Sequence, residues 1–475
     1  MKRCFAEWLL VYSLTLITMG VAPGQGRACG GGAEGGGGKN EDADQVEPTP
    51  DNLQIPEDWA PDVRAGFEQA LVAYRNAHVS RQKDDIRKAI AVMEATKQSV
   101  GASALPHFYI GMLQLDQREF GKARAALTKA TGILPALHEA HTALGDTWFR
   151  EHKPEKSIPH YQRALELAPR SLNAVYQGSI ALIQTGRFDE ARGYVDRALA
   201  IWQEDRLLKV SAELDLLTKG PKWDKTYTVE TKNYFLRTDV SQEFAERAGE
   251  TAELIREVYD AAFPDLAQPD RKYCVLIYRE LADYMRDGAP DGTAGFYDPL
   301  FKHLNVSWRG NEEETLMVLK HEGFHQYCHQ YLEDIPQWFN EGLAEYFAAS
   351  KITVKKNKRL IEMGPHPWRL HSIATAIEAN QYPTIKELMH MSQTEMYEPS
   401  KMQLHYSQAW SICNFCADGA DGKYRPTMRK YFKSLIGGKS QAEAFDNSFG
   451  KVNMSAFENE WREYVLKMWK TESRR

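Results

Sequence analysis

The sequence predicts a multidomain protein in which an all-α solenoid of helical repeats precedes an α+β domain with a helical C-terminal part. Three observations lead to this fold class. Small residues recur every 34 residues in the N-terminal half, segments that alternate polar and apolar residues follow, and two histidines then stand four residues apart on a predicted helix. A chain of 475 residues with 43% hydrophobic composition is long enough for two or three domains.

The N-terminus predicts an exported protein. A positively charged start precedes an apolar run from Trp8 to Ala22, which is too short to span a bilayer comfortably and indicates a secretory signal peptide over residues 1–28. Cys29 precedes three glycines and is a candidate lipid anchor, although the residues before it differ from those expected before a lipidated cysteine. Residues 29–58 are rich in Gly, Glu, Asp and Pro, so we expect a flexible leader. No later segment is apolar enough to span a membrane.

Residues 59–220 are predicted to be a domain of helical repeats. A period of 34 residues, with small residues where paired helices touch, is typical of tetratricopeptide repeats. We expect three clear repeats, a degenerate helical pair over residues 59–103 before them, and a capping helix over residues 206–219. Such a domain is expected to bind a protein partner in its groove. The residues that recur are Gly111 and Gly145, Ala123 and Ser157, Leu127 and Tyr161, Ala130 and Ala164, and Pro135 and Pro169.

Residues 221–475 are predicted to form the second domain, which begins with strands. Alternating polar and apolar residues around Lys232-Asn233 indicate a first hairpin, and a second hairpin precedes the helix with the two histidines. A helix and a single strand are expected between the hairpins. The predicted elements are strands 226–230 and 234–238, helix 241–262, strand 272–278, and strands 294–298 and 304–308.

A His-Glu-x-x-His segment that begins at His321 has the residues of a metal-dependent hydrolase. On a helix, His321 and His325 lie on one face, so both imidazoles can reach a single metal ion. Glu322 stands beside the first ligand, where its carboxylate can take a proton from a metal-bound water. Asn311 is a predicted N-cap, and the apolar spacing after it predicts one helix over residues 312–331.

A second phrase, Trp-Phe-Asn-Glu-Gly at residues 338–342, follows the histidines. With these two phrases the chain resembles the gluzincin metallopeptidases, and in particular the bacterial peptidase-MA-like domains that accompany tetratricopeptide repeats. The resemblance covers roughly residues 226–470. It implies a zincin-like metallopeptidase domain with a core over residues 226–350, a helical part over residues 351–475, a catalytic Zn²⁺ ion, and a peptide or protein substrate. It also implies that Gly295-Phe296-Tyr297, on an edge strand, pairs with the extended substrate.

Two glutamates are candidates for the third zinc ligand. By the resemblance, the Asn-Glu-Gly phrase indicates Glu341. Glu345, one turn later, would then accept the ring N–H of His321 and fix its tautomer. The spacing favours the opposite assignment, because only 15 residues separate His325 from Glu341, whereas 19 separate it from Glu345, as in familiar gluzincins. Glu341 is the predicted ligand on the strength of the phrase.

Peptide hydrolysis also needs a hydrogen-bond donor for the charge that develops on the carbonyl oxygen. In related metallopeptidases a Tyr or His from a later helix donates this hydrogen bond. Tyr406 is the predicted donor, because the phrase around it resembles the helix that follows the zinc site in the family. An ordinary core tyrosine is the alternative interpretation, and His405 is the substitute donor.

Other histidines and cysteines have simpler interpretations. His329 continues the stripe of His321 and His325, but three successive turns of a straight helix cannot converge on one ion, so we expect a partly exposed residue. Cys413 and Cys416 form a lone Cys-x-x-Cys pair in an apolar helical run, which favours buried packing over a metal site.

The predicted function is that of an exported zinc peptidase with a protein-binding repeat domain. A net charge of −6 gives no basic surface, so nucleic acid is not an expected partner. The alternative is a non-catalytic binding or assembly protein whose peptidase-like domain is inactive, and a third possibility is hydrolysis of a non-peptide amide. The presence of Glu322 together with both histidines and the Asn-Glu-Gly phrase favours catalysis.

Overall fold

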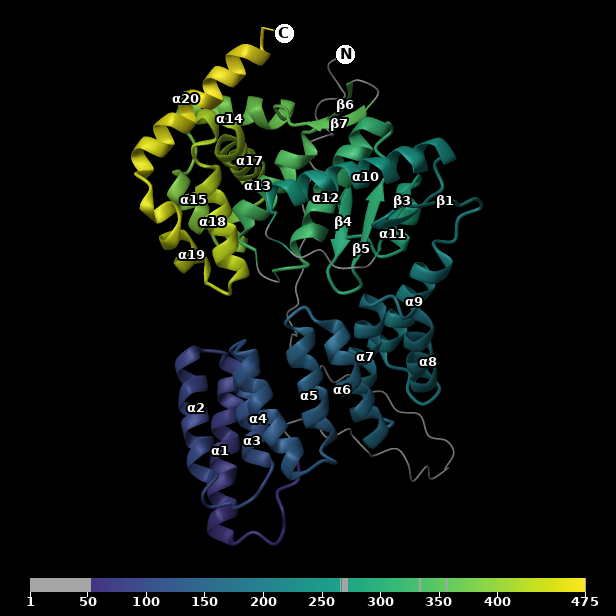
Figure 1. Ribbon diagram of the computed structural model, residues 1–475, viewed down its shortest axis with the longest axis vertical. Helices are drawn as coiled ribbons and strands as arrows, with labels where there is room; N and C mark the ends of the chain where they lie inside the picture. Colours follow the sequence, from purple (N-terminus) through teal and green to yellow (C-terminus); the bar gives the residue numbers. More distant parts are fainter. Residues whose placement is uncertain (1–52, 265, 267–271, 333–334, 356–357, 475) are drawn as a thin grey trace, which may run out of the picture. The chain divides into compact units, whose positions relative to one another are not determined.

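The computed structural model describes residues 53–264, 266, 272–332, 335–355 and 358–474 (Figure 1). The predicted signal peptide, Cys29 and most of the predicted leader lie outside these residues. The described chain forms two compact units, one up to Lys219 and one from Gly220 onward. Among the described residues, no helix combines the length and the apolar character that a membrane span requires.

The first unit consists of helices that pack in consecutive pairs (Figure 1). Three pairs, α3 with α4, α5 with α6 and α7 with α8, are the predicted repeats, and α1 with α2 is the predicted degenerate pair. Helix α9 follows the last pair, where the capping helix was expected. The bounds are α1 Pro61–Ser80, α2 Lys83–Thr96, α3 Leu105–Asp116, α4 Phe120–Ile133, α5 His138–Phe149, α6 Pro154–Leu167, α7 Leu172–Gln184, α8 Phe188–Leu199 and α9 Asp205–Lys219.

The packing within each helical pair explains why glycine recurs. A Cβ atom added to Gly111 would lie 2.6 Å from Cγ of Leu127, on the second helix of the same pair. One repeat later, a Cβ atom added to Gly145 would lie 2.5 Å from the ring of Tyr161. Both positions therefore need glycine so that a large side chain of the paired helix can lie against the backbone.

The second unit begins with a five-stranded sheet of order β1-β2-β3-β5-β4. β2 and β3, and β3 and β5, are parallel, whereas β1 and β4 pair antiparallel with their neighbours. β4 is an edge strand, so within the described chain its outer side has no strand partner. The bounds are β1 Tyr227–Glu230, β2 Tyr234–Thr238, β3 Tyr273–Tyr278, β4 Gly295–Asp298 and β5 His303–Ser307, each within two residues of the predicted strand.

Helices α10 (Gln242–Ala262) and α12 (Glu312–Cys328) pack on one face of this sheet (Figure 1). Val318 and Leu319 of α12 meet the apolar strand residues that point to this face, such as Val275 and Leu304. α12 contacts both β4 and β5, which brings the helix with the two histidines next to the edge strand. A short helix, α11 (Leu281–Arg286), lies between β3 and β4 in the chain.

Helix α12 is shorter than the predicted helix 312–331. It ends at Cys328, and the N–H groups of Tyr331 and Leu332 both bond to the carbonyl oxygen of Cys328. The N–H of Tyr331 reaches back three residues and not four, so the chain leaves the α-helical pattern in a tighter turn.

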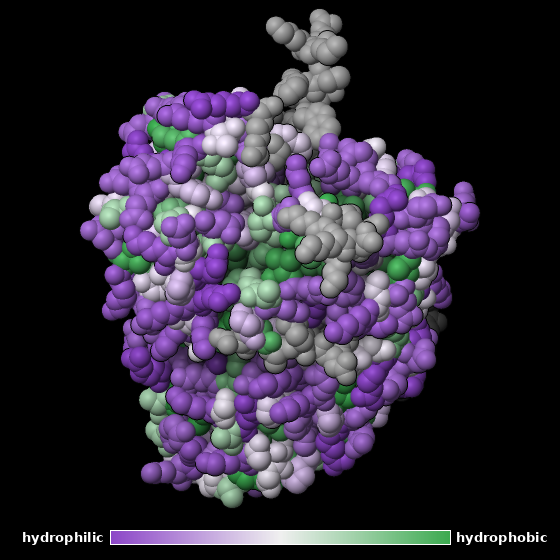
Figure 2. Space-filling model, turned by 45° about the horizontal axis from the view of Figure 1, so that its top comes forward, coloured by the Kyte–Doolittle hydropathy of each residue, from purple (hydrophilic) through white to green (hydrophobic). Residues whose placement is uncertain are grey.

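The C-terminal part is mostly helical, as predicted, but the prediction missed a hairpin at its start. β-branched residues between Lys351 and Lys355 favour the first strand of this hairpin. On the face shown in Figure 2, hydrophilic residues dominate and hydrophobic residues gather near the centre. The bounds are α13 Gln337–Ala348, β6 Lys351–Lys355, β7 Lys358–Glu362, α14 Pro367–Ala379, α15 Ile385–His390, α16 Gln393–Met396, α17 Met402–Asp418, α18 Arg425–Ile436, α19 Gln441–Asn447 and α20 Met454–Glu472.

Candidate metal centre

Helix α12 carries His321, Glu322 and His325 into the interior of the second unit. Its N-terminus is capped as predicted, because Oδ1 of Asn311 accepts the N–H of Glu314 at 2.9 Å. Every residue from Val318 to Cys328 is buried, so the helix is covered on all sides around the two histidines. Two imidazoles and a carboxylate in such surroundings require polar or charged partners.

Helix α13 places Glu341 opposite these histidines. The glycine of the Asn-Glu-Gly phrase lets α13 approach α17 closely, since a Cβ atom added to Gly342 would lie 2.6 Å from the carbonyl oxygen of Ala409. The same Cβ atom would lie 2.7 Å from Sγ of Cys413. The glycine therefore sets the position of the helix that carries Glu341.

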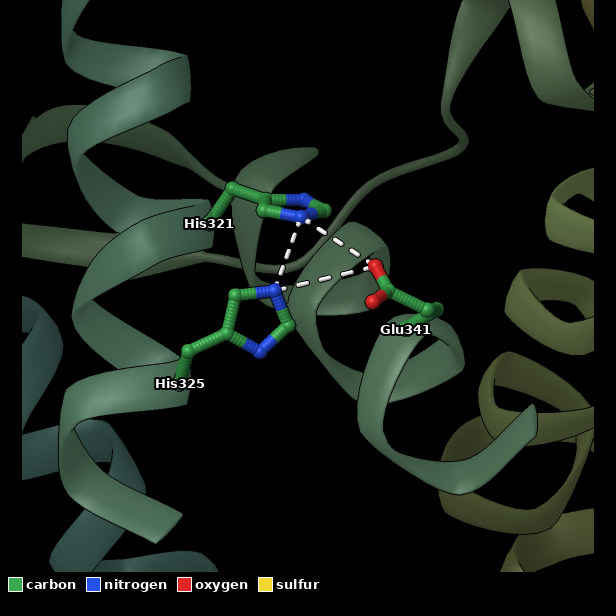
Figure 3. A group of neighbouring side chains, drawn as sticks. All are labelled: His321, His325 and Glu341. Atoms are coloured by element: carbon green, nitrogen blue, oxygen red, sulfur yellow. Dashed lines mark hydrogen bonds and ion pairs between the residues drawn. The ribbon is translucent and has the colours of Figure 1, made fainter. Parts of the chain in front are cut away.

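Three side-chain atoms converge from these two helices (Figure 3). Nε2 of His321 lies 3.1 Å from Nε2 of His325. Oε2 of Glu341 lies 3.4 Å from the first nitrogen and 3.6 Å from the second. Zinc bonds of about 2.0–2.1 Å at tetrahedral angles separate neighbouring ligand atoms by about 3.3 Å. The three atoms therefore have the spacing of ligands around one zinc ion.

Two buried carboxylate oxygens also favour a cation at this centre. Within the described part of the chain, neither Oε2 of Glu322 nor Oε2 of Glu341 makes a hydrogen bond. The oxygen of Glu341 has only ion-pair contacts with the two imidazole nitrogens, at 3.4 Å and 3.6 Å. A buried oxygen without a hydrogen bond is costly, and a metal ion with a bound water would satisfy both oxygens. Two imidazoles and one carboxylate are also the donor set of catalytic zinc sites that keep a fourth position open.

The edge strand β4 lies directly against Glu322. A Cβ atom added to Gly295 would lie 2.8 Å from Cγ of Glu322 and 2.6 Å from Cγ1 of Val318. Burial raises the pKa of the Glu322 carboxyl, although the neighbouring His325 and His321 partly oppose this shift. A carboxyl group with a raised pKa beside the three converging side chains is suited to general acid and base chemistry.

Two of the converging side chains have a polar partner that fixes their orientation. Nδ1 of His325 lies 3.0 Å from Oδ1 of Asn340, so a proton on Nδ1 leaves the lone pair of Nε2 facing the centre. The phenol of Tyr397 donates to Oε1 of Glu341 at 2.8 Å, which leaves Oε2 for the centre. Tyr397 also lies 2.8 Å from Oε1 of Gln337.

Glu345 lies behind His321 and not at the centre. Its Oε1 is 3.7 Å from Nδ1 of His321 and accepts Nη2 of Arg369 at 2.7 Å, while its Oε2 is 3.0 Å from Nε2 of His366. Burial opposes the charge of Glu345, yet Arg369, His366 and His321 hold its pKa well below the usual range. Both oxygens thus face other partners, and of the two glutamates Glu341 alone directs an oxygen at both Nε2 atoms.

The charges around the centre favour an added cation. Burial disfavours charge on His321, but the neighbouring carboxylates of Glu341, Glu345 and Glu322 outweigh it and raise the pKa of His321 to about 9. Burial likewise disfavours charge on Glu341, yet the imidazoles of His325 and His321 lower its pKa. In the metal-free protein a proton on His321 supplies the positive charge that the carboxylates favour, and a metal ion would take the place of that proton.

The structure places Tyr406 beside Tyr397, the residue that bonds to Glu341. Tyr406 is buried on α17, and its ring centroid lies 6.1 Å from that of Tyr397. Burial, followed by the charge of Glu341, raises the pKa of the Tyr406 phenol well above its usual value. His405 turns elsewhere, because its Nδ1 lies 3.1 Å from the carbonyl oxygen of Met396. His329 is partly exposed and packs against the ring of Tyr297, in agreement with its interpretation as a non-ligand.

The four described cysteines are free thiols. Cys328, Cys413 and Cys416 are buried, and burial raises the pKa of the Cys328 and Cys413 thiols well above the usual value. Neutral buried thiols are poor nucleophiles and poor ligands, so the packing interpretation of these residues agrees with their surroundings.

Sequence reasoning missed Asn340, Tyr397, His366 and Arg369. Asn340 belongs to the Asn-Glu-Gly phrase and follows His325 by fifteen positions. Its position directly before Glu341 in the sequence could have indicated it. The other three come from α14 and its N-cap and from the residue after α16. No local spacing connects them to the histidines, and only the packing of the C-terminal helices brings them there.

Two family comparisons match parts of the chain. Residues 108–171 and 142–206 match tetratricopeptide repeats, so the N-terminal region contains these repeats. Residues 315–432 match a family described as a protein of unknown function, DUF1570. This second match contains most of α12 and all of α13, and thus all three converging side chains.

Three similar proteins each align with about a third of the chain. The E3 SUMO-protein ligase RanBP2 of Pan troglodytes is 22% identical over 161 residues, which are 34% of this chain and 5% of that protein. The structure of YrrB, a tetratricopeptide protein with an unusual peptide-binding site, is 16% identical, with a TM-score of 0.27, over 34% of this chain and 84% of its own. A thermophilic tetratricopeptide protein of Thermus thermophilus is 14% identical, with a TM-score of 0.28, over 33% of this chain and 84% of its own.

Proposed function

We propose that residues 221–475 form a zinc-dependent peptidase of the gluzincin type. The observation that carries this proposal is the convergence of His321, His325 and Glu341, whose ligand atoms lie 3.1–3.6 Å apart. The buried carboxylate of Glu322, beside the same helix turn, adds a proton acceptor. An ordinary helix on the protein surface would not bury two histidines and two glutamates in this way.

The residues of the chain have distinct roles in the proposed reaction. A zinc ion held by the three ligands would polarise the scissile carbonyl and lower the pKa of its water. Glu322 accepts the proton of the attacking water and returns it to the leaving amine. A phenol with a raised pKa keeps its proton at neutral pH, so Tyr406 remains the proposed hydrogen-bond donor to the carbonyl oxygen.

The substrate of the proposed reaction is an extended peptide. The outer side of β4, which pairs with no other strand of the described chain, offers its backbone to such a segment, and Gly295 brings this strand against Glu322. A peptide paired with β4 would therefore have its backbone close to the proton acceptor.

Metal analysis tests the zinc assignment directly. The purified protein should carry about one zinc ion, and His321→Ala or His325→Ala should lose it, because two remaining ligands hold zinc poorly. His390→Ala is a matched control, since this exposed histidine packs on Phe445 away from the centre. Zinc retained in all three variants after dialysis would refute the assignment.

A digest of a peptide library separates the peptidase from a non-catalytic binding protein. The wild-type protein should cleave peptides, whereas Glu322→Gln should keep zinc and fold but lose several orders of magnitude in kcat. Stoichiometric zinc without cleavage of any peptide in the wild-type protein would favour the non-catalytic alternative.

The repeats would bind a protein partner or a large substrate. Repeat arrays fold through contacts between neighbouring repeats, so the peptidase unit should not depend on them. A protein without residues 27–220 should still cleave short peptides, and its cleavage of the preferred protein substrate should fall. Loss of zinc from the shortened protein would contradict this division of roles.

We also propose export by the signal peptide, with Cys29 as a candidate lipid anchor. Cell fractionation with and without residues 1–28 tests the export. Cys29→Ser tests the anchor, because a lipidated protein would leave the membrane fraction on this change.

A further inference from the structure

Arg369, on α14, is a buried arginine that contacts two other helices. It is 7% exposed. Its Nη2 lies 2.7 Å from Oε1 of Glu345 on α13, and its Nη1 lies 2.7 Å from Oε1 of Gln403 on α17. Its Cζ atom also lies 5.3 Å from the ring centroid of Tyr406. One planar group therefore contacts both the carboxylate behind His321 and the proposed carbonyl donor.

His366, at the N-cap of the same helix, holds the second oxygen of Glu345. The backbone N–H of Arg369 points to Nδ1 of His366, so the ring proton is on Nε2, which lies 3.0 Å from Oε2 of Glu345. With one oxygen held by Arg369 and the other by His366, the plane of the Glu345 carboxylate is determined. The fixed carboxylate presents Oε1 to Nδ1 of His321 at 3.7 Å, the distance of an ion pair, and so favours one orientation of the imidazole.

A buried ion pair is a weak source of stability, because apolar residues of similar volume often serve as well. The geometry of Arg369 instead favours orientation, since a planar guanidinium with several fixed donors constrains each partner. Glu345 receives one of these donors, Gln403 receives another, and the ring of Tyr406 faces the same group.

We propose that Arg369 is a positioning residue that orients the imidazole of His321 through Glu345 and, with the same guanidinium, the ring of Tyr406. The inference rests on the proposed metal centre for its functional meaning. It assigns to α14 a role in metal binding and turnover, exerted through Glu345 and not through a contact with the metal.

Arg369→Lys is the decisive variant, because it keeps the positive charge and removes the planar arrangement of donors. Arg425→Lys is the matched control: Arg425 also uses its guanidinium within the C-terminal part, where Nε donates to the carbonyl oxygen of Ala417 at 3.0 Å. Zinc affinity, the absorption spectrum of the cobalt-substituted protein and kcat are measured for both variants.

Arg369→Lys should lower zinc affinity about 10–100-fold, the usual effect of losing a group behind a metal ligand. Its cobalt spectrum should change, and kcat should fall more than KM rises. In a Glu345→Gln background the same change should have little further effect on zinc affinity, because the two residues act through one contact. Zinc affinity and a cobalt spectrum equal to those of Arg425→Lys would overturn the proposal.

Two further measurements keep the proposal testable. If Arg369→Lys does not fold, the same measurements are made on Gln403→Leu, which removes the acceptor of Nη1 of Arg369 and should lower zinc affinity about 10-fold. Equal affinity in Gln403→Leu and wild type would then overturn the proposal.

If the wild-type protein binds no metal, the proposed function fails and the inference is tested on the metal-free protein. Nitrogen NMR shifts of His321 report the protonation and the polar contacts of its two ring nitrogens, and they should differ between wild type and Arg369→Lys. Identical shifts in these two metal-free proteins would refute the positioning role.

Discussion

The phenol of Tyr397 lies 2.8 Å from Oε1 of Glu341, and this contact determines which oxygen of the glutamate faces the two histidines. Oε2 is left 3.4 Å from Nε2 of His321 and 3.6 Å from Nε2 of His325. A carboxylate without this partner could rotate and present either oxygen, so the tyrosine would order the proposed metal ligand before a metal binds.

Tyr397→Phe should therefore weaken zinc binding about 10–100-fold while the fold is kept, because one hydrogen bond to the ligand is lost. Competition with a zinc-binding dye measures the affinity. Tyr464→Phe is the matched control, since its phenol bonds to Asn414 at 2.8 Å away from the centre. Equal affinities in the two variants would show that Tyr397 does not orient the ligand.

Glu341→Ala and Glu345→Ala should differ in severity. Glu341→Ala removes an oxygen that faces both imidazoles and should release most of the zinc. Glu345→Ala should cost about 10–100-fold in affinity, because it only frees His321 to rotate. Zinc titration of the two purified variants gives the order, and tighter binding in Glu341→Ala would mean that Glu345 is the ligand.

Gly295→Ala should impair turnover without loss of zinc. The added Cβ atom would meet Cγ of Glu322 at 2.8 Å, so the carboxylate must move, and a displacement of about 1 Å can cost about 100-fold in rate. Gly364→Ala is the control in the same unit, because its Cβ atom would meet only the carbonyl oxygen of Ala349 at an ordinary 3.8 Å. Steady-state kinetics and zinc content of both variants check the prediction, and unchanged kcat in Gly295→Ala would contradict it.

Asp146 should make the stability of the repeats depend on pH. Burial raises the pKa of this carboxyl from 3.8 to about 6, although the hydrogen bond from Tyr161 opposes the shift. The folded state then binds the proton more tightly than the unfolded state, so the contribution of Asp146 to the free energy of unfolding is largest below about pH 4. It declines as the pH rises to about 6 and is constant above that.

Asp146→Asn should remove this decline. Urea unfolding of both proteins between about pH 4 and pH 7 measures the difference in unfolding free energy, and wild type should lose stability relative to the variant over this range. The exposed Asp84→Asn is the control for the loss of one charge. A difference between Asp146→Asn and wild type that does not vary with pH would contradict the shift.

Features that repeat along the chain were predictable from the sequence. The 34-residue period follows from contacts such as Gly111 with Leu127 and Gly145 with Tyr161, which recur from one helical pair to the next. The shared face of His321 and His325 follows from the helical repeat alone. Such contacts join residues at short and regular separations, and periodicity in the sequence records them.

Tertiary structure decided which groups complete the centre. The spacing of the glutamates favoured Glu345, but the crossing of α12 and α13 turns Glu341 toward the histidines, and Arg369 holds Glu345 behind them. Tyr397 follows Glu341 by 56 positions. Contacts over such separations depend on how whole helices pack, and a single sequence has no periodic signal for them.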